Sequence, residues 1–254
     1  MKMRFLLPFL MTMCVFASCG STGVKYYKVE VVAEYDHDVK AYTQGLFFQD
    51  GTLYESTGQN GESSFRKVDL QSGKVLEQMN FDEKYFVEGS VILEDNLYIL
   101  TWESRVAFVY DANTLKYKST WKYPREGWGL ATDGKRLIAS DGSPFIYFMD
   151  KDFKLERKVT VRLNDRHVRW LNELEVINGK IWANVYTSDE IVIINPKDGT
   201  VEGVIDCKGL LPSSLRTPDT DVLNGIAYDK KTGKIYLTGK NWPKLYEVRI
   251  VEKD

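Results

Sequence analysis

The chain of 254 residues lacks the residues on which several common classes of protein depend. It has two histidines, His37 and His167, in unrelated contexts, and three cysteines. No His-Glu-x-x-His motif and no cysteine cluster occurs, so we expect no catalytic metal ion. The formal net charge is −2 and no basic run is present, which argues against binding to nucleic acid. Neither a Gly-x-Ser-x-Gly motif nor a glycine-rich phosphate loop is found.

Residues 1–18 are predicted to be a lipoprotein signal peptide. Lys2 and Arg4 give it a positive end, and residues 5–16 form an apolar stretch that is too short to span a membrane. The close, Phe16-Ala-Ser-Cys-Gly20, resembles a bacterial lipobox, although Phe16 stands where an aliphatic residue is usual. We therefore expect residues 19–28 to be a lipidated N-terminus and linker. Cys19 would anchor an exported monomer on the periplasmic side of a bacterial membrane; an ordinary cleaved signal peptide is the alternative.

Cys207 is the one cysteine that would remain unmodified after cleavage before Cys19. We therefore expect no disulfide within the mature chain, despite the oxidising compartment that export implies. Because Cys207 follows the apolar pair Val204 and Ile205, we predict that it is a buried side chain and not a nucleophile.

From about residue 29 onward the sequence predicts short strands and no long helix. Runs of β-branched and aromatic residues alternate with Gly, Asp and Asn turns. One layout occurs five times, opening at Gln44-Gly-Leu46, Glu88-Gly-Ser90, Trp128-Gly-Leu130, Asn172-Glu-Leu174 and Asn224-Gly-Ile226. The spacings of 44, 40, 44 and 52 residues are typical of β-propeller repeats. We predict that residues 29–254 form an all-β, five-bladed β-propeller.

The repeats also predict how the ring closes. Residues 24–39 would supply a strand that pairs with the last blade, which removes exposed sheet edges. Residues 209–221 lengthen the last spacing, and we interpret them as a surface loop. No cofactor is expected to be required, although Asp-rich loops offer oxygen ligands for a structural calcium ion.

The first position of each opening varies more than packing alone would favour. In a propeller the first strand of each blade lines the central channel, so these positions converge at one mouth. Together with the residues that follow the second strands, they place on one rim a carboxylate, carboxamides, aromatic rings and an ammonium group: Glu88, Gln44, Asn172, Trp102, Trp128, Tyr186 and Lys240. Such a rim is typical of a small-molecule site. We interpret Asn224 as a turn cap, expect Glu55 to face a neighbouring strand or solvent, and give Glu126, Glu173 and Asp141 no chemical role.

Six ordered motifs resemble those of the plant and bacterial glutamine cyclotransferases (glutaminyl cyclases). They are Tyr42-Thr-Gln-Gly-Leu46, Tyr54-Glu-Ser-Thr-Gly58, Glu126-Gly-Trp-Gly-Leu130, Leu171-Asn-Glu-Leu-Glu175, Leu223-Asn-Gly-Ile-Ala-Tyr228 and Thr238-Gly-Lys-Asn-Trp-Pro-Lys244. The resemblance implies a five-bladed propeller that cyclises the N-terminal Gln of peptides and exported proteins to pyroglutamate and releases ammonia. It further implies that Glu88 is the catalytic acid and that the other rim residues bind the substrate. Tyr186 stands where the family usually has Trp, and Tyr42 where it usually has Phe.

These residue types suit that reaction. Ring closure is intramolecular, so the enzyme has to hold the reactive conformation and move protons. One carboxyl group can accept the proton of the amine and deliver it to the leaving amide nitrogen. Burial between Trp102 and Trp128 would raise the pKa of Glu88, and the amide oxygen could bind to Asn172, Gln44 or Lys240.

Two other functions remain open at this point. A non-catalytic propeller lipoprotein could bind peptides or sugars at the same rim, since propellers host many functions; such a protein has no need of a buried acid among amide-binding groups. A propeller hydrolase such as a lactonase usually needs a channel metal, for which one carboxylate and a lysine make a poor site.

Overall fold

The regular secondary structure of the chain is almost wholly β-strand, as the sequence predicts, in a computed structural model that describes residues 23–253. The predicted signal peptide and Cys19 lie outside the described residues. Ser213–Leu215 forms a short 3₁₀ helix. No helix in the described part of the chain has the length and apolar character needed to cross a membrane.

Three sheets have four strands each, taken from consecutive segments of the chain. The first is β2 (Thr43–Gln49), β3 (Thr52–Thr57), β4 (Ser64–Val68) and β5 (Val75–Asn80). The second is β6 (Val87–Leu93), β7 (Asn96–Thr101), β8 (Val106–Asp111) and β9 (Tyr117–Lys122). The third is β10 (Leu130–Thr132), β11 (Leu137–Ala139), β12 (Phe145–Met149) and β13 (Leu155–Thr160).

The remaining long strands form one eight-stranded sheet that closes the structure. Its order is β16 (Leu171–Ile177), β17 (Lys180–Val185), β18 (Glu190–Ile194), β19 (Val201–Asp206), β1 (Lys25–Asp36), β22 (Lys244–Glu252), β21 (Lys234–Gly239) and β20 (Leu223–Asp229). The first strand β1 pairs antiparallel with the last strand β22, which confirms the predicted closure, and it also pairs parallel with β19. A small ribbon of β14 (Arg162–Leu163) and β15 (Arg166–His167) lies outside these sheets.

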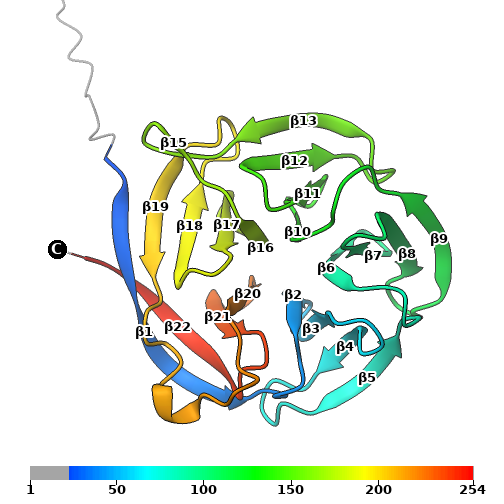
Figure 1. Ribbon diagram of the computed structural model, residues 1–254, viewed down its shortest axis with the longest axis horizontal. Helices are drawn as coiled ribbons and strands as arrows, with labels where there is room; N and C mark the ends of the chain where they lie inside the picture. Colours follow the sequence, from blue (N-terminus) through cyan, green and yellow to red (C-terminus); the bar gives the residue numbers. More distant parts are fainter. Residues whose placement is uncertain (1–22, 254) are drawn as a thin grey trace, which may run out of the picture.

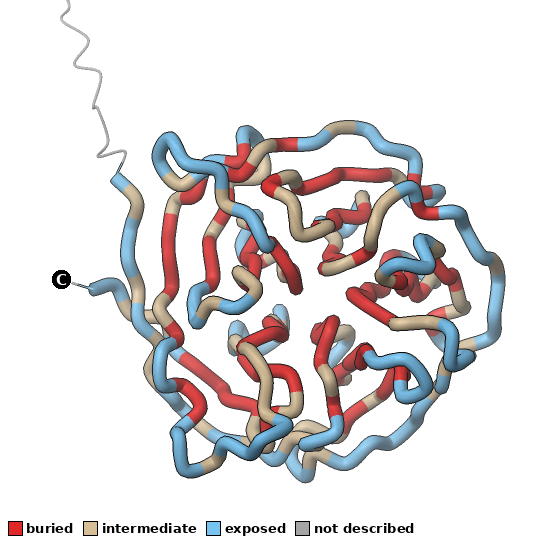
Figure 2. Tube along the Cα trace, in the orientation of Figure 1, coloured by how far each residue is buried: buried red, intermediate tan, exposed pale blue. Residues whose placement is uncertain are grey.

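The sheets stand around a common centre like the spokes of a wheel (Figure 1). The first strand of each group (β2, β6, β10, β16 and β20) lies innermost, and β5, β9, β13, β19 and β1 form the outer wall. Buried residues gather on the inner strands, and exposed ones on the outer strands β1, β5, β9 and β13, whereas β19, which pairs with β1, is mostly buried (Figure 2). Between the sheets, buried hydrophobic side chains of neighbouring groups pack together, as where Phe65 meets Leu97 and Phe108. Apolar contact between adjacent sheets therefore holds the ring together.

Glycines at the inner strands let neighbouring sheets approach closely. A Cβ atom on Gly129 would lie 2.0 Å from the backbone oxygen of Asn172, and one on Gly89 would lie 2.4 Å from the nitrogen of Leu130. Gly89 uses this closeness to donate its N–H to the backbone oxygen of Trp128 at 2.7 Å. The glycine of the repeated opening is therefore required for packing, because a side chain there would keep the ends of the inner strands apart.

Glu173 replaces that glycine in the fourth repeat and acts as a cross-link of the inner strands. Its buried carboxyl group accepts the backbone N–H of Leu46 at 3.3 Å and that of Ile226 at 2.9 Å. Burial and the nearby Glu175 raise the pKa of Glu173 well above its usual range. The side chain therefore has a structural role that the sequence did not reveal.

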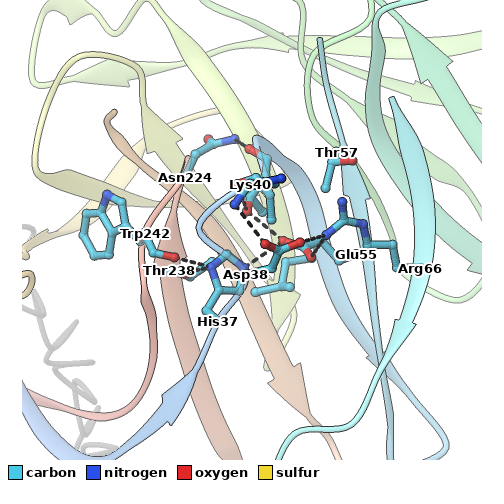
Figure 3. A network of polar contacts seen from close by, with 12 residues as sticks. His37, Asp38, Lys40, Glu55, Thr57, Arg66, Asn224, Thr238 and Trp242 are labelled. Atoms are coloured by element: carbon cyan, nitrogen blue, oxygen red, sulfur yellow. Dashed lines mark hydrogen bonds and ion pairs between the residues drawn. The ribbon is translucent and has the colours of Figure 1, made fainter. Parts of the chain in front are cut away.

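A polar cluster joins the first and last sheets where the chain closes (Figure 3). We call His37, Asp38, Glu55 and Arg66 the closure cluster. Nδ1 of His37 lies 2.7 Å from the backbone oxygen of Trp242, and its Nε2 lies 2.9 Å from Oε1 of Glu55. Both partners can only accept a hydrogen bond while Glu55 is ionised, so both ring nitrogens must donate and His37 is an imidazolium. Glu55 is thus buried against a neighbouring strand and does not face solvent.

The segment 209–221 is only partly the surface loop that the sequence suggests. Leu210 and Leu211 are buried in the core beneath it, because two consecutive leucines provide apolar area that the end of the sheet would otherwise expose. At its end, Asp221 accepts the hydroxyl of Tyr42 at 2.8 Å. The loop therefore supports Tyr42, which lines the central pocket described below. Cys207 is buried, as predicted.

Candidate active site

One cavity of about 430 Å³ lies where the inner strands end, and all seven predicted rim residues line it. Those residues are Gln44, Glu88, Trp102, Trp128, Asn172, Tyr186 and Lys240. Four further residues complete the lining: Tyr42, Gln59, Phe86 and Trp170. The structure therefore brings together residues from every repeat, whereas the role of each in catalysis or binding stays a prediction.

Glu88 is the second residue of β6 and is 5% exposed. Its backbone oxygen accepts the hydroxyl of Ser56 at 2.7 Å, which fixes the main chain at this point. Burial raises the pKa of its carboxyl group well above the usual range; Lys240 acts against this rise and Glu126 adds to it. A carboxyl group in such a setting favours its neutral form, in which it can donate a proton.

Gln44 lies beside Glu88, and a hydrogen bond with Asn224 orients its amide group. Its Nε2 donates to Oε1 of Glu88 at 3.2 Å, and its Oε1 accepts Nδ2 of Asn224 at 3.3 Å. Nδ2 of Asn224 also donates to the backbone oxygen of Thr43 at 2.9 Å. Asn224 is therefore no turn cap but a buried link that sets the orientation of the Gln44 amide toward the acid.

Aromatic rings form most of the pocket wall. Phe86 stands edge-on to Trp102, with ring centroids 5.5 Å apart, and Trp128 stands edge-on to Tyr186 at 5.8 Å. Between the two pairs, Oε2 of Glu126 accepts both indole N–H groups, from Trp102 at 3.0 Å and from Trp128 at 3.3 Å. Edge-to-face contacts of this kind add to the stabilisation that burial alone provides.

Lys240 completes the wall on the other side of the pocket. It follows β21, is 3% exposed, and its Nζ lies 4.7 Å from the ring centre of Tyr42 and 5.0 Å from that of Tyr186. Burial lowers the pKa of Lys240, while the carboxyl groups of Glu88 and Asp221 act in the opposite direction. Over residues 23–253, no ion pair within 4.0 Å joins Lys240 to Glu88. Its hydrogens are therefore available to a ligand.

Asn172, near the start of β16, presents an unsatisfied acceptor. The residue is 2% exposed, and its buried Oδ1 has no hydrogen-bond partner in the described part of the chain. Leaving a buried acceptor unpaired costs about 1–3 kcal/mol. A ligand with an N–H group could relieve that cost, which marks Asn172 as a binding position.

The sequence reasoning missed several members of the site. Phe86 and Trp170 each stand two residues before the first residue of a repeated opening, Glu88 and Asn172, a position that could have indicated the rim. Gln59 lies at a turn with φ of 84° and carries no signal that would separate it from other turns. Glu126, set aside as a neighbour of the motif, proves to bond two of the predicted aromatic residues. Within residues 23–253, no group of three His, Cys, Asp or Glu side chains is placed to hold a metal ion.

The fold and the pocket together define an all-β protein of propeller-like architecture with one buried acid in an aromatic, amide-rich pocket at its centre. The chain belongs to the glutamine cyclotransferase family, whose model matches residues 6–250, and it is therefore an enzyme of the cyclotransferase class. This confirms the resemblance found in the motifs.

Individual relatives agree with this assignment. The chain is 47% identical over 230 residues to the glutaminyl-peptide cyclotransferase of Arabidopsis thaliana, covering 88% of this chain and 71% of the relative. It resembles the crystal structure of Myxococcus xanthus glutaminyl cyclase with a TM-score of 0.84 and 35% identity, covering 91% of this chain and 100% of that one. The WD40 β-propeller domain of Doa1 shares the fold alone, with a TM-score of 0.50 and 14% identity, covering 80% of this chain and 62% of that one.

Proposed function

We propose that the chain converts the N-terminal glutamine of peptides and proteins to pyroglutamate and releases ammonia, with Glu88 as the general acid and base. The observation that carries this proposal is the buried carboxyl group of Glu88, whose pKa is raised, inside a pocket of aromatic and amide side chains. The family of the chain and the names of its relatives support the same reaction.

The reaction moves protons within one pocket. The neutral α-amine attacks the side-chain amide carbon, so a carbon–nitrogen bond forms and the amide oxygen gains negative charge. Glu88 gives its proton to the amide nitrogen, which leaves as ammonia when the carbon–nitrogen bond breaks. The resulting carboxylate takes the surplus proton of the attacking nitrogen and is restored. Such general acid–base catalysis is worth about 10²–10⁴-fold.

The reactive state holds protonated Glu88 and a neutral amine. An α-amine has a pKa near 8, so about a tenth is neutral at pH 7. We therefore expect a bell-shaped dependence of kcat/KM on pH. Protonation of the substrate amine limits the rate on the acid side, and ionisation of Glu88 limits it on the alkaline side.

The other polar groups of the pocket offer the substrate both hydrogen-bond donors and hydrogen-bond acceptors. Lys240 offers N–H donors for the amide oxygen on which charge grows, as the sequence predicts. Oδ1 of Asn172 is an unpaired acceptor, and we propose that it accepts an N–H of the substrate, in place of the oxygen-binding role suggested by sequence alone. Gln44 already donates to Glu88 and in our proposal positions the acid.

We further propose that the architecture is a propeller of five blades. Support comes from treating β16–β19 and β20–β22 with β1 as two blades, since the pairing of β1 with β19 is what joins them into one sheet. An experimental structure with another number of four-stranded units would contradict this count.

The location of the protein is proposed from the sequence. We propose that Cys19 is lipidated and holds an exported monomer on the periplasmic side of a bacterial membrane, with no cofactor required. A Cys19→Ser variant should then lose radioactive palmitate labelling and leave the membrane fraction. Equal labelling of both forms would contradict lipidation.

The decisive experiment measures ammonia release from a dipeptide that begins with Gln. Purified residues 20–254 should release ammonia and form pyroglutamate, and Glu88→Gln should lower kcat/KM by about 10²–10⁴-fold. Glu103→Gln changes an exposed glutamate and serves as the matched control, with full activity expected. An inactive parent protein would exclude the proposed reaction and favour a non-catalytic binding protein, whereas a fully active Glu88→Gln would exclude Glu88 as the general acid and base.

A further inference from the structure

Glu126 connects two walls of the pocket that belong to different sheets. Trp102 follows β7 of the second sheet, whereas Trp128 precedes β10 of the third sheet. One oxygen of Glu126, Oε2, accepts the indole N–H of both. These are the polar contacts of the two indole nitrogens within the described residues, and both end on the same atom.

The backbone beside Glu126 is held firmly, so its carboxyl group is well placed to fix the rings. Gly127 donates its N–H to the backbone oxygen of Thr101 at 3.0 Å. A Cβ atom on Gly127 would lie 2.5 Å from the Cβ of Leu100, which shows how closely the segment lies against β7. The carboxyl group of Glu126 therefore reaches the two rings from a fixed main chain, as precise positioning requires.

Apolar packing alone does not set the rotation of an indole ring. Trp102 touches Phe86 and Trp128 touches Tyr186 through edge-to-face contacts, which several ring orientations could make. A hydrogen bond to a charged acceptor is stronger and more directional. It selects the orientation in which both indole nitrogens point toward Glu126.

We propose that Glu126 is a positioning residue of the active site, which holds the indole rings of Trp102 and Trp128 as the walls that confine the substrate side chain. This inference rests on the proposed function. Its effect on turnover would arise through the two rings, because a loosely held substrate spends less time in the reactive conformation. Glu126 also adds to the rise in the pKa of Glu88, which provides a second readout.

Two variants separate the roles of the acceptor and the charge. Glu126→Met removes the acceptor at similar volume, and we expect kcat/KM on a Gln-initiated dipeptide to fall about 10- to 100-fold, as for other misplaced active-site groups. Glu126→Gln keeps an acceptor oxygen and should recover kcat/KM to within about threefold of the parent, in line with the weaker bond of a neutral acceptor. Glu103→Met alters an exposed neighbour of Trp102 and is expected to match the parent.

The dependence of kcat/KM on pH distinguishes positioning from a general structural defect. Without the negative charge of Glu126, the pKa of Glu88 falls, although Lys240 still faces it. The alkaline limb should therefore move to lower pH in Glu126→Gln, a shift that a loss of stability would not produce. The inference would be overturned if Glu126→Gln left the alkaline limb unshifted and lowered kcat/KM as much as Glu126→Met does.

A measurement without turnover tests the contacts of Glu126 with the two indole rings separately from the proposed reaction. In NMR spectra of the folded protein, the indole N–H signals of Trp102 and Trp128, assigned with Trp→Phe variants, should both move upfield in Glu126→Met. Unmoved signals, or an unchanged kcat/KM in Glu126→Met beside an active parent, would refute the positioning role. An inactive parent whose two signals still move would refute the proposed reaction and leave the contact with Glu126 intact.

Discussion

Two of the buried carboxyl groups of this protein, those of Glu55 and Glu88, have surroundings that shift their pKa values in opposite directions. Glu55 is 1% exposed and Glu88 is 5% exposed. Glu55 meets a ring nitrogen of His37 at 2.9 Å and the hydroxyl of Thr43 at 2.7 Å, with Arg66 at 4.0 Å. Among the described residues, the carboxyl group of Glu88 receives one hydrogen bond, from the amide of Gln44.

The difference in partners decides the protonation of each group. Burial acts to raise the pKa of Glu55, but the charges and hydrogen bonds of His37, Arg66 and Thr43 together lower it. Burial raises the pKa of Glu88, and Lys240 does not offset this. A buried acid with a full set of partners holds the structure, whereas one with few partners keeps a proton that chemistry can use.

The largest effect on stability is expected from removing the charge of Glu55. Glu55→Gln leaves the buried imidazolium of His37 without its counter-ion, and breaking a buried pair costs about 3–5 kcal/mol. Urea denaturation at pH 7 should show this loss, while the remaining folded protein keeps its kcat/KM. Glu88→Gln, which breaks no such pair, should show no comparable loss.

Equal stability of the Glu55→Gln variant and the parent would contradict the structural role of the closure cluster. A Glu55→Gln variant that lost catalysis but kept its stability would reverse the comparison. The two variants share the same substitution, so any difference between them comes from the surroundings of each carboxyl group.

The pH dependence of stability should separate the two regions more finely. Folding raises the pKa of Glu88 above 4.5, so its contribution is complete below that pH and is lost as pH rises toward the folded pKa. Burial acts to lower the pKa of His37, but Glu55, the oxygen of Trp242 and Asp38 raise it above 6.5. Its contribution is complete below pH 6.5 and is lost as pH rises through the folded pKa.

Unfolding free energies between pH 4 and 9 test these signs. Relative to the parent, Glu88→Gln should gain stability from about pH 4.5 upward, because the parent alone bears the cost of keeping a buried acid protonated. His37→Gln should be less stable than the parent at pH 6 and approach it only above pH 6.5, as the imidazolium of the parent loses its proton. A constant difference across the range would contradict the assigned pKa directions.

Much of the fold could be predicted from the sequence because the repeats encode it locally. Alternating strands, Gly and Asn turns and an opening at a spacing of 40 to 52 residues predict sheets around a channel. Rim residues could be found because they recur at equivalent positions of the repeats. Glu88 is the first residue of a repeated opening, and Lys240 is a residue that follows a second strand. The closing strand β1 was predictable for a related reason, since the last repeat lacked a partner strand.

The rest depends on contacts between distant residues that no local pattern encodes. His37 and Glu55 carry no motif, and their importance appears only when β1 returns to the end of the chain. The role of Glu126 depends on its hydrogen bond to Trp102 of the preceding repeat. The role of Asn224 depends on its hydrogen bonds to Thr43 and Gln44 near the start of the chain. Burial of Leu210 and Leu211 likewise follows from the space beneath the last sheet, which the loop alone does not reveal.

The smallest predicted effect applies the same reasoning to two tyrosines of the pocket. The hydroxyl of Tyr42 already donates to Asp221, whereas the hydroxyl of Tyr186 has no protein hydrogen bond among residues 23–253. An unpartnered hydroxyl at the wall is free to bond the substrate, so Tyr186→Phe should raise KM about two- to tenfold, the worth of one neutral hydrogen bond. Tyr42→Phe should leave KM within about twofold and lower stability by about 1 kcal/mol. Steady-state kinetics on Gln-initiated peptides provides the measurement, and an unchanged KM in Tyr186→Phe would show that the ring alone, and not the phenol, serves the substrate.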